Sequence, residues 1–277
     1  MLRFLLFRKL RALVLNLEDS KKWFSHSKHL LQQILNIKDF VPTDVLVTHE
    51  TVFDYDFSIL QQILVEIQSK NLNELAVYLP DIYCENERNI HRGIKNHIHL
   101  NLTSLVIHSF NKSTAAQILS IRSVKLAKVS FSFKFEDHDF YQEFYFSLAQ
   151  FLTHHSTVLQ SISLKCSCEI PFKSVFQNPT LDNFFFCKLK SVQFVLQNFQ
   201  FSCLERMCCK ILQSHVLIDA KLSHSLLDFM MNQLICVNAQ KIVVVLPKQI
   251  LGLRFFAKIL NLYKRHDSIN FDQPCED

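Results

Sequence analysis

Cysteine and histidine are the first candidates for chemistry, because thiolates and imidazoles are the ligands that zinc prefers. The closest groups are Cys166-x-Cys168, Cys203-x4-Cys208-Cys209, His97-x-His99 and His154-His155. A structural zinc site usually joins two paired motifs, and none of the nine cysteines forms a C-x-x-C pair. We expect no metal site. The odd cysteine count predicts reduced, apolar-packed thiols in the cytoplasm or the nucleus.

Catalysis would need a constellation of residues that stands out from chance. A chain with 9 Cys and 13 His contains many Cys/His pairs by chance, so such pairs are weak evidence for a catalytic nucleophile and its base. The acidic run 136–139 offers carboxylates to a cation, but it falls in an expected turn where Asp139 suits a helix cap. The run 21–24 (K-K-W-F) interleaves cations and aromatic rings, as nucleic-acid surfaces do, yet it also fits a helix with Trp23 packed inward. We expect no catalytic residue and no nucleic-acid partner.

Composition excludes several further classes. The 277 residues contain only Gly93 and Gly252, too few for a Rossmann fingerprint, a P-loop or a G-x-S-x-G nucleophile elbow. The sequence therefore predicts no cofactor. Four basic residues interrupt the apolar N-terminal segment 1–11, and no apolar stretch reaches about 18 residues, so neither a signal peptide nor a membrane span is expected.

A short strand motif recurs ten times along the chain. It is apolar-x-x-apolar-x-apolar, and its clearest copies are Leu10-Leu13-Leu15, Leu72-Leu75-Val77, Leu102-Leu105-Ile107, Leu126-Val129-Phe131, Leu159-Ile162-Leu164 and Leu189-Val192-Phe194. Weaker copies are Pro42-Val45-Val47, His215-Ile218-Ala220, Ala239-Ile242-Val244 and His266-Ile269-Phe271. Their mean spacing is about 28 residues, which fits one short strand plus one helix.

Between the motifs the apolar period changes from 2 to 3.6, which predicts amphipathic helices. The expected helices are residues 28–37, 57–67, 113–121, 140–153, 201–212, 226–237 and 250–263, with Ser113 and Ser225 as N-caps. The sequence thus predicts an α/β fold. Residues 1–277 would form a single domain of about ten strand–helix units, each buried against its neighbours.

The motif and its period resemble those of irregular leucine-rich-repeat proteins with long, helix-backed repeats, over residues 10–273. Similar repeats occur in F-box-type substrate receptors, innate-immune nucleotide-switch receptors and PRAME-like proteins. The unit beginning at Leu102 is also similar to the nematode F-box-associated domain. The resemblance implies a horseshoe-like solenoid with parallel strands on its concave face.

Two features depart from the family. Regular repeats place Asn or Cys at the ninth motif position, where the side chain satisfies turn backbone groups. The ninth positions here are Glu18, Glu50, Pro80, Phe110, Lys134, Ser167, Gln197, Ser223, Pro247 and Pro274. The turns must therefore be satisfied differently. Only nine residues precede the first motif, so an N-terminal cap is missing. We expect either another chain to cover this end or the sequence to be part of a larger protein.

The strand positions between the apolar ones point away from the helices and form a stripe. The candidate partner-binding residues are Glu74, Tyr78, Ser104, His108, Lys128, Ser130, Ser163, Lys165, Gln193, Asp219, Lys221 and Lys241. Small side chains with a few lysines suit an extended acidic or polar segment of a protein partner. A solvated face without a ligand is the alternative.

These features predict a non-enzymatic protein-interaction scaffold. By resemblance alone, it would be the substrate-recognition module of a ubiquitin-ligase receptor, with the ligase adaptor bound through a segment outside this chain. The first alternative is the sensor portion of an innate-immune nucleotide-switch receptor. The second is an uncapped isoform fragment without a function of its own.

Overall fold

The structure is a computed structural model that describes residues 12–16, 29, 32–33, 43–48, 63–67, 71–78, 98–108, 118–135, 138–168, 185–197, 203–214, 218–233, 235–245 and 269–272. The chain divides into two compact units, Met1–Leu126 and Ala127–Asp277. A single solenoid domain over 1–277 stays a prediction. The basic run 21–24 and the expected helix 250–263 lie outside the described residues.

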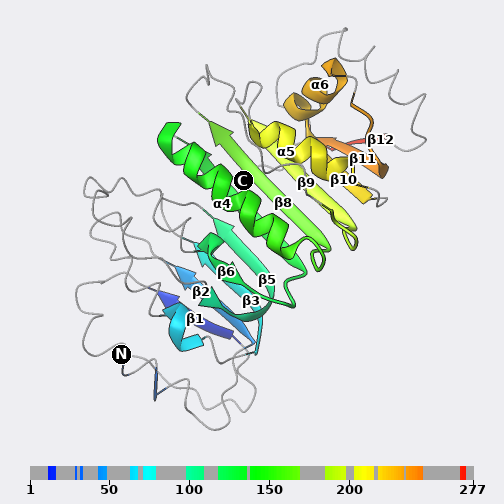
Figure 1. Ribbon diagram of the computed structural model, residues 1–277. Coiled ribbons are helices and arrows are strands. Elements are labelled where there is room, and N and C mark those ends of the chain that lie inside the picture. The colour runs from blue at the N-terminus through cyan, green and yellow to red at the C-terminus, as the bar shows by residue number, and fades with distance from the viewer. Residues whose placement is uncertain are drawn as a thin grey trace. The chain divides into compact units, whose positions relative to one another are not determined.

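In the first unit, four parallel strands lie side by side in chain order (Figure 1). They are β1 (Ala12–Asn16), β2 (Asp44–Thr48), β3 (Asn71–Tyr78) and β5 (Asn101–His108). A separate two-stranded ladder, which the sequence did not predict, pairs β4 (Ile98–His99) with β6 (Ile121–Arg122). Residues 63–67 are helical and bury Ile63, Leu64 and Ile67.

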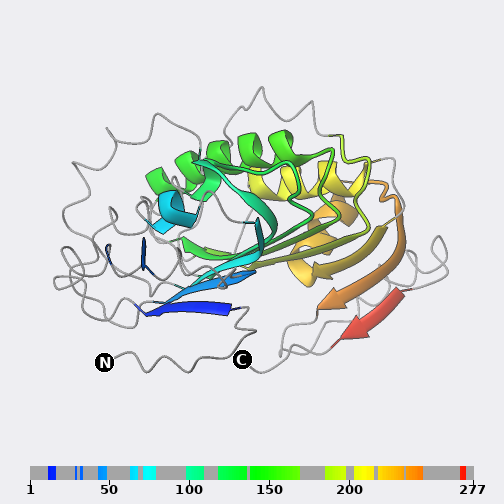
Figure 2. The same cartoon turned by 90° about the horizontal axis from the view of Figure 1, so that it is seen from below.

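The second unit continues the alternation of strands and helices. Its strands, parallel and in chain order, are β7 (Lys128–Phe135), β8 (Ser161–Cys168), β9 (Ser191–Gln197), β10 (Ile218–Ser223), β11 (Ala239–Val245) and β12 (Ile269–Asp272). Its helices are α4 (His138–His155), α5 (Cys203–Leu212) and α6 (His224–Asn232). Figure 2 shows α4 (green) and α5 (yellow) on one face of these strands. The second and third residues of each of the ten expected motifs lie on a strand, so the predicted α/β alternation is confirmed.

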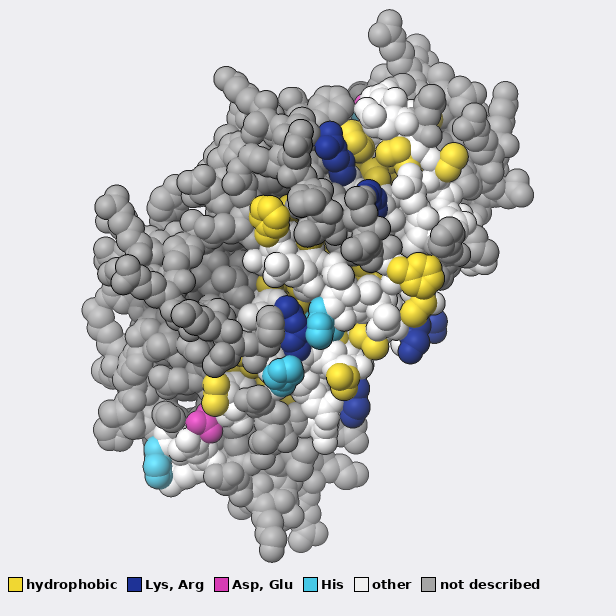
Figure 3. Space-filling model, viewed as in Figure 1, with side chains coloured by type: hydrophobic (Ala, Val, Ile, Leu, Met, Phe, Trp, Pro, Cys, Tyr) yellow, Lys and Arg dark blue, Asp and Glu magenta, His cyan; other side chains and the backbone are white. Residues whose placement is uncertain are grey.

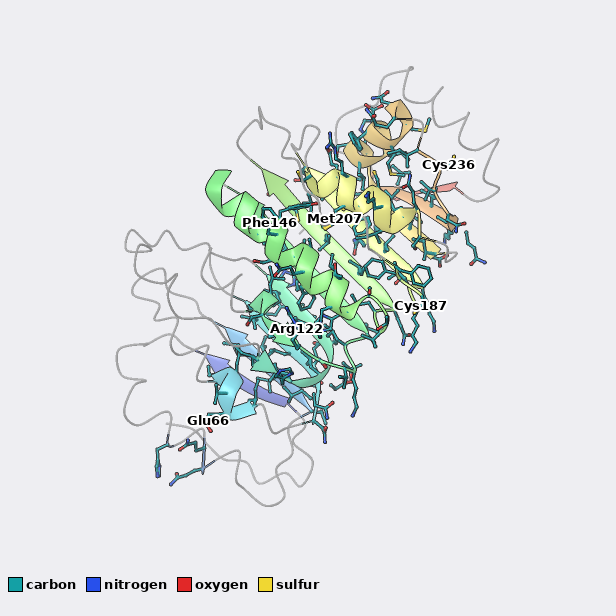
Figure 4. All side chains as sticks on the ribbon, in the orientation of Figure 1. Glu66, Arg122, Phe146, Cys187, Met207 and Cys236 are labelled. Carbon is teal, nitrogen blue, oxygen red and sulfur yellow. The ribbon has the colours of Figure 1, made fainter. Side chains whose placement is uncertain are left out.

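An aromatic core joins α4 to β7. Buried residues recur along α4 at helical spacing, among them Phe144, Leu148 and Phe151, whereas Phe146 is 46% exposed (Figure 4). Phe131 on β7 is 1% exposed, and its ring centroid lies 5.6 Å from that of Phe151 in an edge-on arrangement. Such pairs stabilise a core beyond the apolar area that they bury.

The entry to three of the described strands, β3, β8 and β9, is built in the same way. One backbone carbonyl accepts hydrogen bonds from two successive amides of the next repeat. The amides of Asn73 and Glu74 donate to the Thr43 carbonyl, those of Gln160 and Ser161 to the Ala127 carbonyl, and those of Lys190 and Ser191 to the Gln160 carbonyl. The register of each of these strands is therefore fixed by its neighbour, as expected for repeats that contact one another in series.

One strand motif was assigned two residues too early. The expected copy His215-Ile218-Ala220 places Ile218 in line with Val192, but the register pairs Val192 with Ala220. A bulge between Ile218 and Asp219, relative to β11, accompanies the shift. Ile218 and Ala220 are both buried, so an alternation of period 2 does not distinguish the two alignments.

The expected helix boundaries need two corrections. Helix α6 begins at His224 with Ser223 as its N-cap, and it ends at Asn232, so the expected span 226–237 and the N-cap Ser225 are wrong. The Ser223 hydroxyl accepts the amide of Leu226, which Ser225 is too close in sequence to do. Residues 118–119 are helical, but Ile121 of the expected helix 113–121 belongs to β6. Helix α4 contains the expected span 140–153, and α5 covers 203–212 of the expected span 201–212, whose first two residues lie outside the described part of the chain.

Two serines take the place of the missing ninth-position asparagine at the end of β9. The Ser223 hydroxyl accepts the Leu196 amide at 3.1 Å and donates to the Leu196 carbonyl at 3.2 Å. Ser225 donates to the same carbonyl. The neighbouring repeat thus supplies hydrogen-bond partners for the buried backbone amide and carbonyl of Leu196. Serine side chains therefore stabilise this turn in the absence of the usual asparagine.

Replacing Ser223 by alanine is expected to lower the free energy of unfolding by about 1–2 kcal/mol. The change removes the helix cap and leaves the buried Leu196 amide without its acceptor. Urea unfolding measures the loss. The control, Ser130→Ala on a half-exposed strand position, is expected to change stability by less than about 0.5 kcal/mol. Equal effects of the two substitutions would contradict the assignment.

Candidate functional site

Within each unit the strands have one buried set and one accessible set of side chains. On β9 the residues alternate between half-exposed and buried from Ser191 to Leu196, and β5 follows the same alternation from Leu105 to His108. The buried set packs toward the helices. We call the accessible set the open face of that unit. The twelve predicted partner-binding residues all lie on an open face, four in the first unit and eight in the second.

On the second unit the register arranges the open face into rows across neighbouring strands. The first row is Lys128, Ser161, Ser191, Asp219 and Lys241. The second row is Ser130, Ser163, Gln193, Lys221 and Val243. The third row is Ser132, Lys165 and Val195. We call these residues the serine–lysine face.

Hydrogen bonds between strands hold the polar side chains of the serine–lysine face. Ser191 donates to the hydroxyl of Ser161 at 3.0 Å, and Ser163 donates to Oε1 of Gln193 at 3.1 Å. Four lysines and one aspartate make the face basic. Lys128, Lys165 and Lys241 are exposed, so their ammonium groups are accessible to a ligand. The arrangement can bind carboxylates along an extended chain.

On the first unit the open face has a different character. Its rows are Asp44, Glu74 and Ser104; Leu46, Ala76 and Val106; and Thr48, Tyr78 and His108. Ser104 donates to Oε2 of Glu74 at 3.0 Å. The rings of Tyr78 and His108 stack with centroids 4.5 Å apart and planes 10° from parallel. We call these residues the acidic–aromatic face.

The sequence placed both sets of residues in one stripe and did not separate them by charge. The separation could have been read from the sequence, because Asp44 and Glu74 lie in the first unit, whereas the four lysines of the serine–lysine face lie in the second. The stacking of Tyr78 on His108 follows from the register, which aligns residues at the same repeat position. A partner for either face stays a prediction.

The side of the second unit that carries α4 and α5 shows no comparable array among its described residues. In Figure 3, hydrophobic and basic side chains are scattered over these elements and do not gather in rows. Met207 of α5 is fully buried, and Arg206 beside it is exposed (Figure 4). This side is the outer surface of an amphipathic layer.

Four of the five cysteines considered as ligands are core residues, and the burial of the fifth, Cys168, lies outside what the structure describes. Cys166, Cys203, Cys208 and Cys209 are all less than 5% exposed. Burial raises the pKa of the Cys166 thiol, and it raises the pKa of Cys209 to about 12 with a smaller contribution from Glu205. Burial is also the main cause that raises the pKa of Cys208, with further contributions from Cys209, Cys166 and Glu205. Such thiols stay protonated at neutral pH and are poor nucleophiles.

One buried cation was not foreseen from the sequence. Arg122 is 8% exposed, and its Nη1 donates to the carbonyls of Leu119 and Ile121 at 2.9 and 3.0 Å (Figure 4). Burial lowers the pKa of this guanidinium. Leu119 ends the helical turn and Ile121 begins β6, so Arg122 holds together the carbonyls at the junction of the turn and the strand.

No group of three or more His, Cys, Asp or Glu side chains suited to a metal ion occurs in the described part of the chain. Among the described helices, none is long and apolar enough to cross a membrane.

Comparisons with protein-family models, with curated proteins and with solved structures found no significant match to this chain.

Proposed function

We propose that this chain is a non-catalytic protein-interaction scaffold that binds an extended acidic segment of a partner protein on its serine–lysine face. The observation that carries the proposal is the alignment of lysines and small hydroxyl side chains in rows across neighbouring strands. Small side chains let an extended chain approach the sheet closely. The lysines then supply charge complementarity along its length.

The scaffold is proposed to be a leucine-rich-repeat solenoid with its strands on the concave face. Three features of the described residues support this. The strands of each unit follow chain order, neighbouring motifs share one register, and the carbonyl-to-amide contact recurs at strand entries. A solenoid presents a broad rigid surface, which suits recognition of a long segment without a deep pocket.

The cellular role that fits such a scaffold is the substrate-recognition module of a ubiquitin-ligase receptor in the cytoplasm or the nucleus. The resemblance to F-box-type repeat proteins supports this role, and the adaptor would bind through a segment outside this chain. The sensor portion of a nucleotide-switch immune receptor is the alternative. Affinity capture from native cells separates the two: ligase adaptors are expected in the first case, and an attached nucleotide-binding domain in the second.

Charge reversal on the serine–lysine face tests the binding proposal. Lys128→Glu/Lys165→Glu is expected to weaken binding of a labelled Glu/Ser-rich peptide roughly tenfold to a hundredfold, because two attractions become repulsions. Fluorescence anisotropy at physiological salt measures the affinity, since salt at that level screens charges more than about 8 Å away.

The matched control is Lys188→Glu/Arg206→Glu, which makes the same charge change at an exposed turn and on α5. Its affinity is expected to stay within about threefold of the original chain. Similar losses in both double variants would show a general charge effect and would overturn the assignment of the face.

A further inference from the structure

We propose that the acidic–aromatic face of the first unit is a second docking surface, for an extended basic segment of a protein partner with two arginines four residues apart. The proposal goes beyond the function assigned above, because it concerns the other unit and a ligand of opposite charge. It does not need the serine–lysine face to bind anything.

The first anchor of this surface is the carboxylate pair at the start of the strands. Glu74 and Asp44 are register partners on adjacent strands, and both are half-exposed. Asp44 accepts from Thr43 at 3.0 Å and from Asn73 at 3.3 Å, so each of its oxygens has a partner. Within the described part of the chain, Glu74 accepts a hydrogen bond from Ser104 through Oε2, and its Oε1 has no hydrogen-bond partner there. A guanidinium can therefore bond Glu74 while Asp44 adds negative potential.

The second anchor is the aromatic pair at the far end of the same strands. Tyr78 is 41% exposed although one flank of its ring is covered by His108. An exposed tyrosine held in place by stacking provides a rigid ring for a planar cation. Arginine suits this position better than lysine, because its guanidinium stacks on aromatic rings.

The spacing of the two anchors sets the sequence of the ligand. Glu74 and Tyr78 are four residues apart on β3, which is about 13 Å along an extended strand. An extended peptide has the same rise, so cations at its first and fifth residues reach both anchors. Between them Leu46 and Val106 are half-exposed apolar residues on either side of the small, buried Ala76. The segment that fits is therefore Arg-x-apolar-x-Arg.

The probe is a short labelled peptide with the core Arg-Ser-Val-Ser-Arg, titrated against the full chain at low salt. Moving the last arginine back by one residue gives the matched peptide Arg-Ser-Val-Arg-Ser. In an extended chain this turns the arginine to the opposite side, away from Tyr78. The first peptide is expected to bind about tenfold more tightly than the second.

Substitutions on the face then identify each anchor. Tyr78→Leu is expected to weaken the first peptide about tenfold and leave the second unchanged, whereas Tyr78→Phe keeps the affinity within about twofold. Glu74→Gln is expected to weaken both peptides about threefold. Lys165→Gln on the other unit is expected to change neither, and circular dichroism checks that every variant is folded.

Four outcomes would overturn the proposal. They are the absence of saturable binding, equal affinity for both peptides, no effect of Tyr78→Leu, or an equal loss in Lys165→Gln.

Sedimentation of the chain alone tests the alternative occupant, a second copy that presents its serine–lysine face. A mass that rises with concentration and falls again in Tyr78→Leu would assign the surface to self-association. The effect of Lys128→Glu/Lys165→Glu on binding of the acidic peptide tests the proposed function of the serine–lysine face and does not test the acidic–aromatic face.

Discussion

Replacement of Phe131 by alanine is expected to lower the free energy of unfolding by about 3–5 kcal/mol. Phe131 is 1% exposed, and its ring lies 5.8 Å from that of Phe133 and 5.6 Å from that of Phe151. The substitution removes apolar contacts and leaves a cavity between β7 and α4 that surrounding rings fill only in part. Phe131→Leu, which keeps most of the volume, is expected to cost less than half as much.

The control is the same substitution at Phe146, which lies on the exposed side of α4. Phe146→Ala is expected to cost less than about 1 kcal/mol, because its side chain is already half in water. Urea unfolding followed by circular dichroism compares the variants. If Phe131→Ala unfolds at the same urea concentration as Phe146→Ala, the aromatic core is not organised as described.

The second large effect is a loss of stability at alkaline pH. The folded-state pKa values of Cys166, Cys208 and Cys209 are raised above their ordinary value of 9.0 by burial. Above pH 9 the unfolded chain releases these protons and the folded chain keeps them. The unfolded state is then favoured by about 1.4 kcal/mol per thiol per pH unit. Between pH 8 and pH 10 the three thiols are expected to remove about 4 kcal/mol of stability.

A comparison of slopes isolates this effect from lysine and tyrosine titration. Cys166→Ala/Cys208→Ala is expected to retain about one third of the thiol contribution, whatever its absolute stability. Cys187→Ser/Cys236→Ser changes the two cysteines that are exposed in the described part of the chain and is expected to leave the slope unaltered. Unfolding in reducing buffer at several pH values gives both slopes. Identical slopes in the original chain and in Cys166→Ala/Cys208→Ala would refute the burial of these thiols.

The strand repeats were predictable because their signal is periodic and repeated. Residues such as Leu75, Leu105 and Ile162 are buried as the motif requires, and their register partners are those that the spacing aligns. The predictions were wrong where they depended on a pattern of only a few residues. The two-residue error at Ile218 and the two-residue error at Ser225 occur where neighbouring residues satisfy the same local rule.

The candidate site was predictable only as a set of positions. Alternation along a strand determines which side chains are accessible, so the twelve residues could be named from the sequence. This alternation does not show which side chains on neighbouring strands contact one another. The stack of Tyr78 on His108 and the Ser104–Glu74 hydrogen bond both join side chains of adjacent strands. The carbonyl partners of Arg122 are local, one and three residues before it, and alternation along a strand does not indicate them either.

The separation between open and buried strand positions has a consequence for binding specificity. Side chains such as Ser130, Gln193 and Val195 are half-exposed on the open face, so changing them leaves the packed layer of Phe131 and Leu164 intact. Substitutions of this kind usually alter stability by less than about 0.5 kcal/mol. The binding preference proposed for the open face can therefore change one side chain at a time, while the packed layer that maintains the fold stays the same.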